Sequence, residues 1–305
     1  MRKIIIAALL LVCYSVVTAQ QTPQYTQYMY NMSAVNPGYV YDNPEVISTG
    51  LLYRKQWVNI DGSPSTANAF INKPFGDKIE VSLNYINDRI GDAISVKNDF
   101  VNLDFAYKIK LSKTFNMSYG VKLGLDSYRI DALNSNVADD QAFGDNLSTI
   151  QMNFGVGGFL FSDNFYAGLS SPNLLPNRAK LGSLTVSQDE LIIYGIAGYI
   201  YDVSDNVLLK PSAVFKQSVG APLSFDLSFN SLIFKRFEAG VSYRYQESFS
   251  GLVGFRVTKD LRIGYAYDFP FNNLNTTSAG SHEIMLLFDF DLLKTGNNFS
   301  SPRFY

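Results

Sequence analysis

The chain has 305 residues, of which 47% are hydrophobic, 14% aromatic and only 17% charged. Ordinary soluble domains carry about 25% charged residues, so this chain is short of charge, although it is long enough to bury a large core. Its many large apolar residues exclude a disordered chain. A net charge of −2 argues against a nucleic-acid-binding protein, because such proteins rely on clustered lysine and arginine.

Residues 1–19 are predicted to form a secretory signal peptide. The positive pair Arg2-Lys3 precedes an apolar run over residues 4–17, and Val17-Thr18-Ala19 is a small-residue cleavage site. The alternative is a membrane-anchoring helix, but the apolar run is shorter than the roughly 20 residues that span a bilayer. The only cysteine of the chain lies within this segment, so we expect neither a disulfide nor a thiolate metal site in the mature protein.

From about residue 46 onward, apolar and polar residues alternate with a period of two. The stretch 101–109 is apolar at every odd position and carries Asn102, Asp104 and Lys108 between them. Side chains along a strand point alternately to opposite faces, so each such stretch has one apolar and one polar face. The pattern predicts fourteen strands: 46–55, 65–73, 79–87, 98–110, 114–127, 148–160, 164–170, 190–201, 206–216, 222–232, 235–246, 248–257, 260–269 and 281–291.

Two architectures can hide the apolar faces of these strands. A soluble sandwich or propeller would bury them against one another, whereas a transmembrane barrel would turn them toward lipid. The polar faces are rich in Gly, Ser, Asn and Asp, and the apolar faces are rich in Tyr and Phe, which suit a bilayer rim. We therefore predict an all-β fold, a transmembrane antiparallel β-barrel of about 14 strands and of the outer-membrane type, over residues 46–291.

The lengths of the connections predict the topology of this barrel. Short turns near 74–78, 111–113, 161–163, 202–205, 233–234 and 258–259 alternate with longer loops near 56–64, 88–97, 128–147, 171–189 and 270–280. Outer-membrane barrels have short periplasmic turns and longer external loops, so both ends of the barrel chain would lie on the periplasmic side. The first and last strands must pair, because lipid offers no hydrogen-bond partner to an open sheet edge.

Residues 20–45 do not have the pattern of a spanning strand. They are rich in Tyr, Gln and Asn and end in the turn signal Asn36-Pro37-Gly38. They form either a periplasmic leader or a segment that folds against or into the polar lumen. The predicted inner face carries charges of both signs, which favours a filled or narrow lumen with a paired internal network. These charges are Arg54, Asp104, Lys122, Asp126, Asp226, Glu238, Arg244, Arg256, Arg262, Asp268 and Asp289.

No residue pattern predicts an enzyme, a cofactor or a metal centre. His282 is the only histidine, and its alternation places it on the lipid face, where a general base has no use. Gly155, Gly157 and Gly158 lie within a strand and lack the Lys-Ser/Thr of a phosphate loop. The pair Asp139-Asp140 lacks the spacing of a calcium loop.

Four motifs stand out along the chain: Gln27-Tyr28-Met29 with Asn31 and Asn36-Pro37; Tyr53-Arg54-Lys55-Gln56-Trp57 with Gly62-Ser63-Pro64 and Thr66; Asn87-Asp88-Arg89-Ile90-Gly91; and Ser301-Pro302-Arg303-Phe304-Tyr305. Together they resemble the PorP/SprF family of type IX secretion outer-membrane proteins, and the resemblance spans essentially the whole mature chain. It differs from the family pattern at Gly38-Tyr39-Val40, where an alanine-rich run is usual, and at the terminal Tyr305.

The resemblance implies a non-enzymatic component of type IX secretion or gliding motility in the outer membrane of a Gram-negative bacterium. Some family members help a secreted surface protein to leave the cell by recognising its C-terminal sorting domain. Others link the outer membrane to a periplasmic complex that includes a peptidoglycan-associated protein. The expected partners are outer-membrane lipid and these proteins, with no nucleic acid. The alternative function is an outer-membrane channel or transporter for a small solute.

The motif residues are candidates for binding or structural roles: Gln27, Tyr28, Asn31, Asn36, Pro37, Arg54, Gln56, Trp57, Gly62, Pro64, Gly91, Pro302 and Arg303. The pattern favours structural roles for these residues over binding roles. Arg54 on an inward face would anchor the amino-terminal segment, Trp57 would be an interfacial anchor, and Gly62 and Pro64 would shape a loop. Residues 292–305 are expected to form a periplasmic tail.

Overall fold

The structure is a computed structural model that describes residues 24–92, 95–131, 147–175, 178–181, 184–188, 191–219, 221–271 and 277–291. Two short 3-10 helices, η1 (Tyr28–Tyr30) and η2 (Met32–Ala34), precede the strands. Neither is long or apolar enough to cross a membrane. The strands are β1 (Val46–Lys55), β2 (Ser65–Phe75), β3 (Ile79–Ile90), β4 (Ser95–Lys110), β5 (Asn116–Asp131), β6 (Leu147–Phe161), β7 (Phe165–Ser171), β8 (Arg178–Leu181), β9 (Leu184–Gln188), β10 (Ile192–Tyr199), β11 (Tyr201–Ser204), β12 (Val207–Ser218), β13 (Ser224–Ile233), β14 (Phe237–Arg244), β15 (Ser248–Arg256), β16 (Leu261–Pro270) and β17 (Ser281–Asp291).

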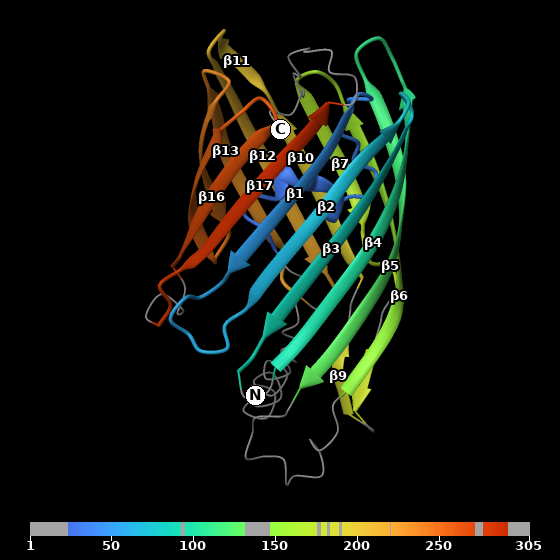
Figure 1. The fold of residues 1–305 in the computed structure, drawn as a ribbon, viewed down its shortest axis with the longest axis vertical. Helices are drawn as coiled ribbons and strands as arrows, with labels where there is room; N and C mark the ends of the chain where they lie inside the picture. Colours follow the sequence, from blue (N-terminus) through green and yellow to red (C-terminus); the bar gives the residue numbers. More distant parts are fainter. Residues whose placement is uncertain are drawn as a thin grey trace, which may run out of the picture.

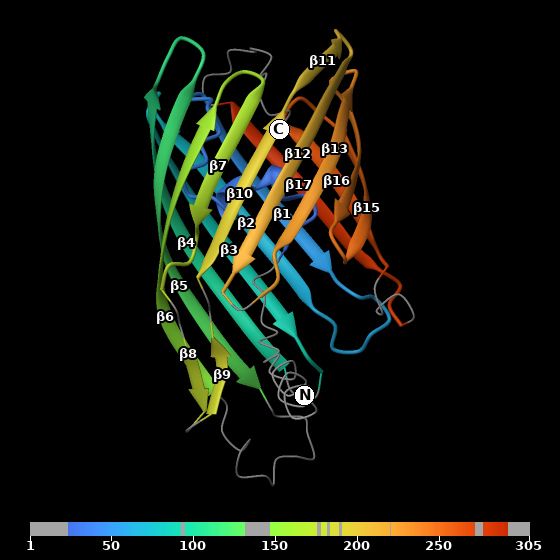
Figure 2. The same ribbon diagram turned by 180° about the vertical axis from the view of Figure 1, so that it is seen from behind.

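The strands form one closed antiparallel barrel (Figures 1 and 2). Neighbours in the chain pair from β1 to β7 and from β12 to β17, β7 pairs with β10, and β8 and β9 form a separate hairpin. The wall closes where β1 pairs with β17, from Val46 opposite Asp291 to Lys55 opposite His282. β11 continues the line of β10 along β12, and the wall is completed by pairing of β10 with β12. The predicted architecture of fourteen wall strands is therefore confirmed.

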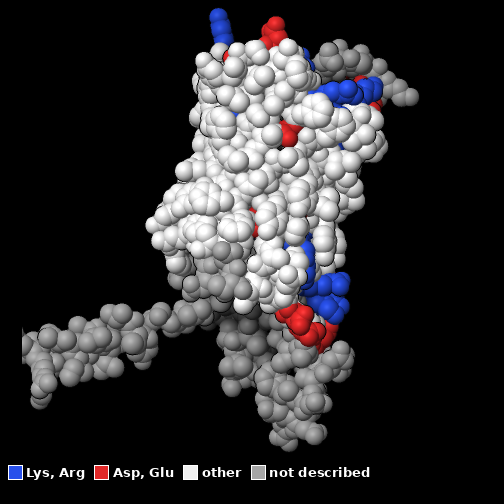
Figure 3. All heavy atoms as spheres, turned by 90° about the vertical axis from the view of Figure 1, so that its left-hand side faces the viewer, with Lys and Arg blue, Asp and Glu red and all other residues white. Residues whose placement is uncertain are grey.

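The outer surface of the barrel is a broad apolar belt. Alternate residues of each wall strand are exposed and hydrophobic, for example Leu103 on β4, Leu123 on β5 and Val241 on β14. Their neighbours along the chain point inward and are mostly polar. Figure 3 shows a wide uncharged band on one side of the barrel, with charged side chains gathered toward its two ends. This arrangement suits strands that cross a bilayer.

Several strands are longer than predicted. The expected long loop at 88–97 is short, because β3 continues to Ile90 and β4 begins at Ser95. The extension is held by polar side chains: Asp99 accepts hydrogen bonds from Tyr85, Asn87 and Arg129. The alternation of apolar residues ends where the side chains leave the lipid, but hydrogen bonding between the strand backbones continues. As a result, β3 to β6 extend beyond the other strands at the long-loop end (Figure 1).

Two further differences concern β7 to β12. The predicted loop at 171–189 contains a separate hairpin, β8 and β9. The predicted strand 190–201 is divided into β10 and β11. Both features fall where the sequence alternates poorly, so the period-two pattern could not locate them.

The belt predicts a depth-dependent cost for a buried cation. Leu123 lies near the middle of β5 and Leu111 lies in the turn that precedes β5, and their exposures are 56% and 53%. We expect Leu123→Arg to destabilise the barrel by about 2–4 kcal/mol and Leu111→Arg by about 0–1 kcal/mol. Urea titration of the two variants in lipid vesicles measures this difference. Equal losses of stability would place Leu123 outside the hydrocarbon.

Candidate functional site

Residues 24–45, which we call the plug, lie inside the barrel. Figure 1 shows the two 3-10 helices of the plug enclosed by the wall strands. Tyr28, Met29 and Met32 expose 5%, 1% and 1% of their surface, so the centre of the plug is buried on every side. The polar residues predicted for this segment thus face the polar inner surface of the barrel.

A buried ion-pair network holds the first described residues of the plug. Arg54 on β1 lies 2.6 Å from Asp268 on β16 and 3.1 Å from Glu283 on β17. The Glu283 carboxylate accepts hydrogen bonds from the backbone N–H groups of Thr26 and Gln27, at 3.0 and 2.7 Å. The Thr26 hydroxyl donates to Asp268 at 2.8 Å. Buried charges are costly unless paired, and here each partner also binds the plug.

The middle of the plug bonds to opposite sides of the wall. Asn31 donates to Asn68 on β2 at 2.7 Å and to Asn84 on β3 at 2.9 Å. The Tyr28 hydroxyl lies 3.0 Å from the hydroxyl of Ser212 on β12. Tyr30 donates to Glu238 on β14. These bonds fix the plug in the centre of the lumen rather than along one strand.

The Asn36-Pro37 turn presses against glycines of the wall. A Cβ on Gly120 of β5 would lie 1.9 Å from the Pro37 carbonyl oxygen, and a Cβ on Gly157 of β6 would lie 2.1 Å from Asn36 Oδ1. The Asn36 amide donates to the Gly158 carbonyl at 3.1 Å. Only glycine permits this approach, so Gly120 and Gly157 make room for the Asn36-Pro37 turn of the plug.

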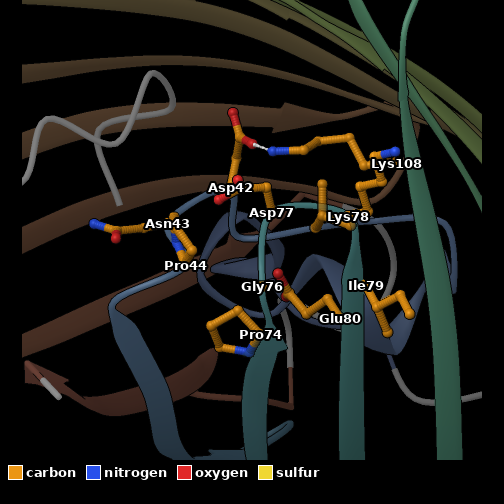
Figure 4. Close-up of a pocket in the computed structure, with 11 residues that line it drawn as sticks. Asp42, Asn43, Pro44, Pro74, Gly76, Asp77, Lys78, Ile79, Glu80 and Lys108 are labelled. Atoms are coloured by element: carbon orange, nitrogen blue, oxygen red, sulfur yellow. Dashed lines mark hydrogen bonds and ion pairs between the residues drawn. The ribbon is translucent and has the colours of Figure 1, made fainter.

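The last part of the plug is held at the opposite end of the barrel. The backbone N–H of Tyr41 donates hydrogen bonds to the two carboxylate oxygens of Glu80, near the start of β3, at 2.9 and 2.7 Å. The Tyr41 hydroxyl donates to Asp289 on β17 at 3.0 Å. Asp42 pairs with Lys108 on β4 beside a shallow pocket between the plug and the β2–β3 turn (Figure 4). Pro44, Pro74 and Lys78 also line this pocket.

These contacts set the direction of the plug. Thr26 and Gln27 are bound where β1 ends and β17 begins, at the end of the barrel with the long loops. Tyr41 is bound where β3 begins, at the end with the short turns. The chain therefore runs through the lumen from the long-loop end to the turn end before it enters β1.

A second cluster of motif residues lies at the long-loop end. Gln56 donates its backbone N–H to the Pro64 carbonyl at 2.9 Å, and Gly91 donates to the Gly62 carbonyl at 2.8 Å. Gly62 has a positive φ of 71°, and a Cβ there would lie 2.9 Å from the Asp92 nitrogen. The loop that follows β1 is thus fixed against the β3–β4 turn.

The same loop also contacts the connection before β17. The Trp57 N–H donates to the Ser281 hydroxyl at 3.3 Å. The Val58 backbone N–H donates a hydrogen bond to the Gly280 carbonyl at 2.9 Å. We call residues 56–64, 91 and 278–280 the outer loop cluster.

The predicted site residues thus separate into two groups. Gln27, Tyr28, Asn31, Asn36, Pro37 and Arg54 meet in the lumen, and Gln56, Trp57, Gly62, Pro64 and Gly91 meet in the outer loop cluster. Pro302 and Arg303 lie outside the described residues, as do Asp139-Asp140 and residues 1–19. The sequence interpretation missed Glu80 and Glu283, although alternation within their strands would have placed both on the inner face.

His282 lies on the outer face, 2.6 Å from the Tyr265 hydroxyl, with no carboxylate among the described residues to orient it as a base. The described residues contain no group of three or more His, Cys, Asp or Glu side chains that could hold a metal ion. The chemistry of the lumen is that of hydrogen bonding and charge pairing.

The direction of the plug can be tested with cysteine labelling, because Cys13 is the only native cysteine. Gln24 lines a recess with Lys216 and Ser224 at the long-loop end, whereas Pro44 is exposed at the turn end. We expect Gln24→Cys to react with a polyethylene-glycol maleimide on intact cells. Pro44→Cys should react only after the outer membrane is opened. The reverse result would contradict this orientation.

The family described as "Type IX secretion system membrane protein PorP/SprF" matches residues 17–288. A FadL homologue of Pseudomonas aeruginosa has a similar fold, with 12% identity, a TM-score of 0.53, and coverage of 90% of this chain and 96% of that chain. The Ralstonia pickettii toluene transporter TbuX has 9% identity, a TM-score of 0.52, and coverage of 87% and 93%. No curated protein matches the chain.

At these identities the two structures show only that the fold is that of an outer-membrane barrel. The family match carries more weight, since it includes the plug and nearly all of the wall. Barrel and family together place the protein in the outer membrane as a multi-pass β-barrel. The chain belongs to the PorP/SprF family of type IX secretion system membrane proteins.

Proposed function

We propose that this barrel is a non-enzymatic docking platform of type IX secretion, which binds a secreted surface protein through its C-terminal sorting domain at the long-loop end. The observation that supports this proposal is that the plug fills the lumen. A lumen filled by the chain's own residues, bonded to opposite sides of the wall, leaves the two ends of the barrel as the surfaces available to partners.

The outer loop cluster has the properties of a docking surface. Its backbone is fixed by hydrogen bonds to the neighbouring connections, so little conformational entropy is lost when a partner binds. Trp57 is half-buried, and Asn59 and Asp61 are exposed. Aromatic residues in such a setting are common anchors of protein interfaces. Cargo recognition in this proposal therefore uses these residues and the adjoining long loops.

The turn end offers a different surface, which suits a periplasmic secretion component. The pocket of Figure 4 is lined by the rigid residues Pro44 and Pro74 and by charged groups of both signs, Asp77 and Lys78. Charges of both signs on one surface suit a protein partner with complementary charges. Linking the outer membrane to the periplasmic complex is thus the second part of the proposal.

Site-specific photocrosslinking in cells separates the two parts. A photoreactive residue at Asp61, in the outer loop cluster, is expected to capture the secreted cargo. The same residue at Asp77, in the β2–β3 turn, is expected to capture a periplasmic secretion component. Both positions are exposed and acidic, so each is the control for the other. Failure to capture any secretion protein or cargo at either position would refute the platform function.

A solute channel is the alternative function, and the plug predicts its electrical behaviour. We expect the purified mature protein to conduct poorly in planar bilayers, because residues 24–45 occupy the lumen. A variant that lacks residues 24–41 should conduct at least about ten-fold more, provided that it retains β-structure by circular dichroism. A large conductance of the intact protein would favour the channel.

A further inference from the structure

Three basic side chains lie in a row on the outer face of the wall, near the long-loop end of β3, β4 and β5. The strand registers place Arg89 on β3 opposite Lys97 on β4, and Lys97 opposite Arg129 on β5. Like charges that lie directly opposite each other destabilise a pair of strands. An anion bound beside this basic row would offset the repulsion.

The basic row lies just beyond the apolar belt. On the outer face, the last exposed large hydrophobic residues toward the long loops are Tyr85, Val101 and Leu125. Each residue of the basic row is four positions farther along the same strand, and this even spacing keeps it on the same face. Four residues of a strand tilted by about 40° rise about 10 Å along the membrane normal. Long basic side chains reach back toward the membrane interface, so their charged ends lie at the level of the lipid headgroups.

The acidic groups on this face do not balance the basic row. Arg129 lies 3.0 Å from Asp99, and Lys97 lies 2.5 Å from Asp131. The Arg89 Nε donates to the neutral amide oxygen of the asparagine two residues earlier, at 2.9 Å, and its guanidinium pairs with no carboxylate of the described residues. The outer face thus has three cations for two carboxylates at this level.

Most donors of the two arginines remain available to a ligand. A guanidinium carries five N–H donors. Toward the residues that the structure describes, Arg89 donates through Nε alone and Arg129 through Nη2 alone. The side chains of Arg129 and Lys97 are 50% and 34% exposed, and Arg89 is exposed as well. Because the planar fork of arginine matches the spacing of phosphate oxygens, the basic row is suited to a phosphate group.

We propose that Arg89, Lys97 and Arg129 bind the phosphate groups of one lipopolysaccharide molecule in the outer leaflet. The long-loop end of an outer-membrane barrel faces the cell exterior. The lipid on that side carries its phosphates on the sugars directly above its acyl chains. Acyl chains that lie against Val101 and Leu125 would therefore bring the phosphates to the basic row.

The two ion pairs within the row are compatible with this ligand. Ion pairs at an exposed surface contribute little to stability, so a phosphate can share or replace the contacts that Asp99 and Asp131 make. A free phosphate ion would have the charge but not the apolar contact with the belt. The combination of a basic row and an apolar surface beside it favours the lipid over the free ion.

Binding of purified lipid A, the phosphorylated lipid part of lipopolysaccharide, to the full mature chain in detergent micelles tests this site. Microscale thermophoresis is expected to show saturable binding of lipid A with its phosphates. Lipid A from which the phosphates have been removed should bind at least about ten-fold more weakly, and millimolar inorganic phosphate should not displace lipid A. Equal affinity for the two forms of lipid A, or displacement by inorganic phosphate, would overturn the proposal without any variant.

A double variant locates the site. Arg89→Gln combined with Arg129→Gln removes two positive charges and should weaken lipid A binding at least ten-fold. The matched control is Lys110→Gln combined with Lys113→Gln, which removes two exposed positive charges at the turn end of the same strand pair and should bind like the native chain. Circular dichroism establishes that both variants are folded. The same affinity in the two double variants would show that the basic row is not the site. Cargo docking does not depend on this site, so such a result would leave the docking proposal intact.

Discussion

The hydrocarbon of a bilayer neither donates nor accepts hydrogen bonds, so each polar group of a spanning chain must find its partner within the protein. The backbone meets this requirement by closing the wall, with β1 paired along its whole length to β17. The side chains meet it by turning apolar residues outward and polar residues inward. The same requirement then applies to the lumen, where the inward polar residues need partners of their own.

The plug supplies many of these partners. Its backbone N–H groups bind Glu283 and Glu80, and its carbonyl groups accept hydrogen bonds from Lys122 and Ser170. Arg54 joins the plug to three wall strands through Asp268 and Glu283. Removing one member of such a buried set typically costs about 3–5 kcal/mol, because the charge left behind is buried without its counterpart. The plug is therefore part of the folded core and not an addition to it.

Local periodicity was sufficient to predict the wall. Alternation along stretches such as 101–109 located β4, and the closure of β1 on β17 followed from the chemistry of lipid alone. The limits of strands were harder to predict. β3 and β4 extend past the apolar belt, where hydrogen bonds from polar side chains to Asp99 hold them together. Strand pairing of this kind does not produce an alternation of apolar and polar residues in the sequence.

The sequence alone did not determine what fills the lumen. The composition of residues 20–45 was compatible with a leader outside the barrel or a segment inside it, because hydrogen bonds between Asn31 and Asn84 or between Tyr41 and Glu80 join positions far apart in the chain. The roles of the strand glycines could not be read either. The need for glycine at positions 120 and 157 is evident only in the structure, where a side chain at either position would clash with the Asn36-Pro37 turn.

The direction of the plug bears on how the barrel is assembled. The first residues of the plug are held at the far end of the lumen by Glu283, whose cross-strand neighbour is Arg54 on β1. The seam between the first and last strands is therefore built partly from the groups that grip the plug. Because Glu283 binds both Arg54 and the plug, we expect the pairing of β1 with β17 and the insertion of the plug to stabilise each other.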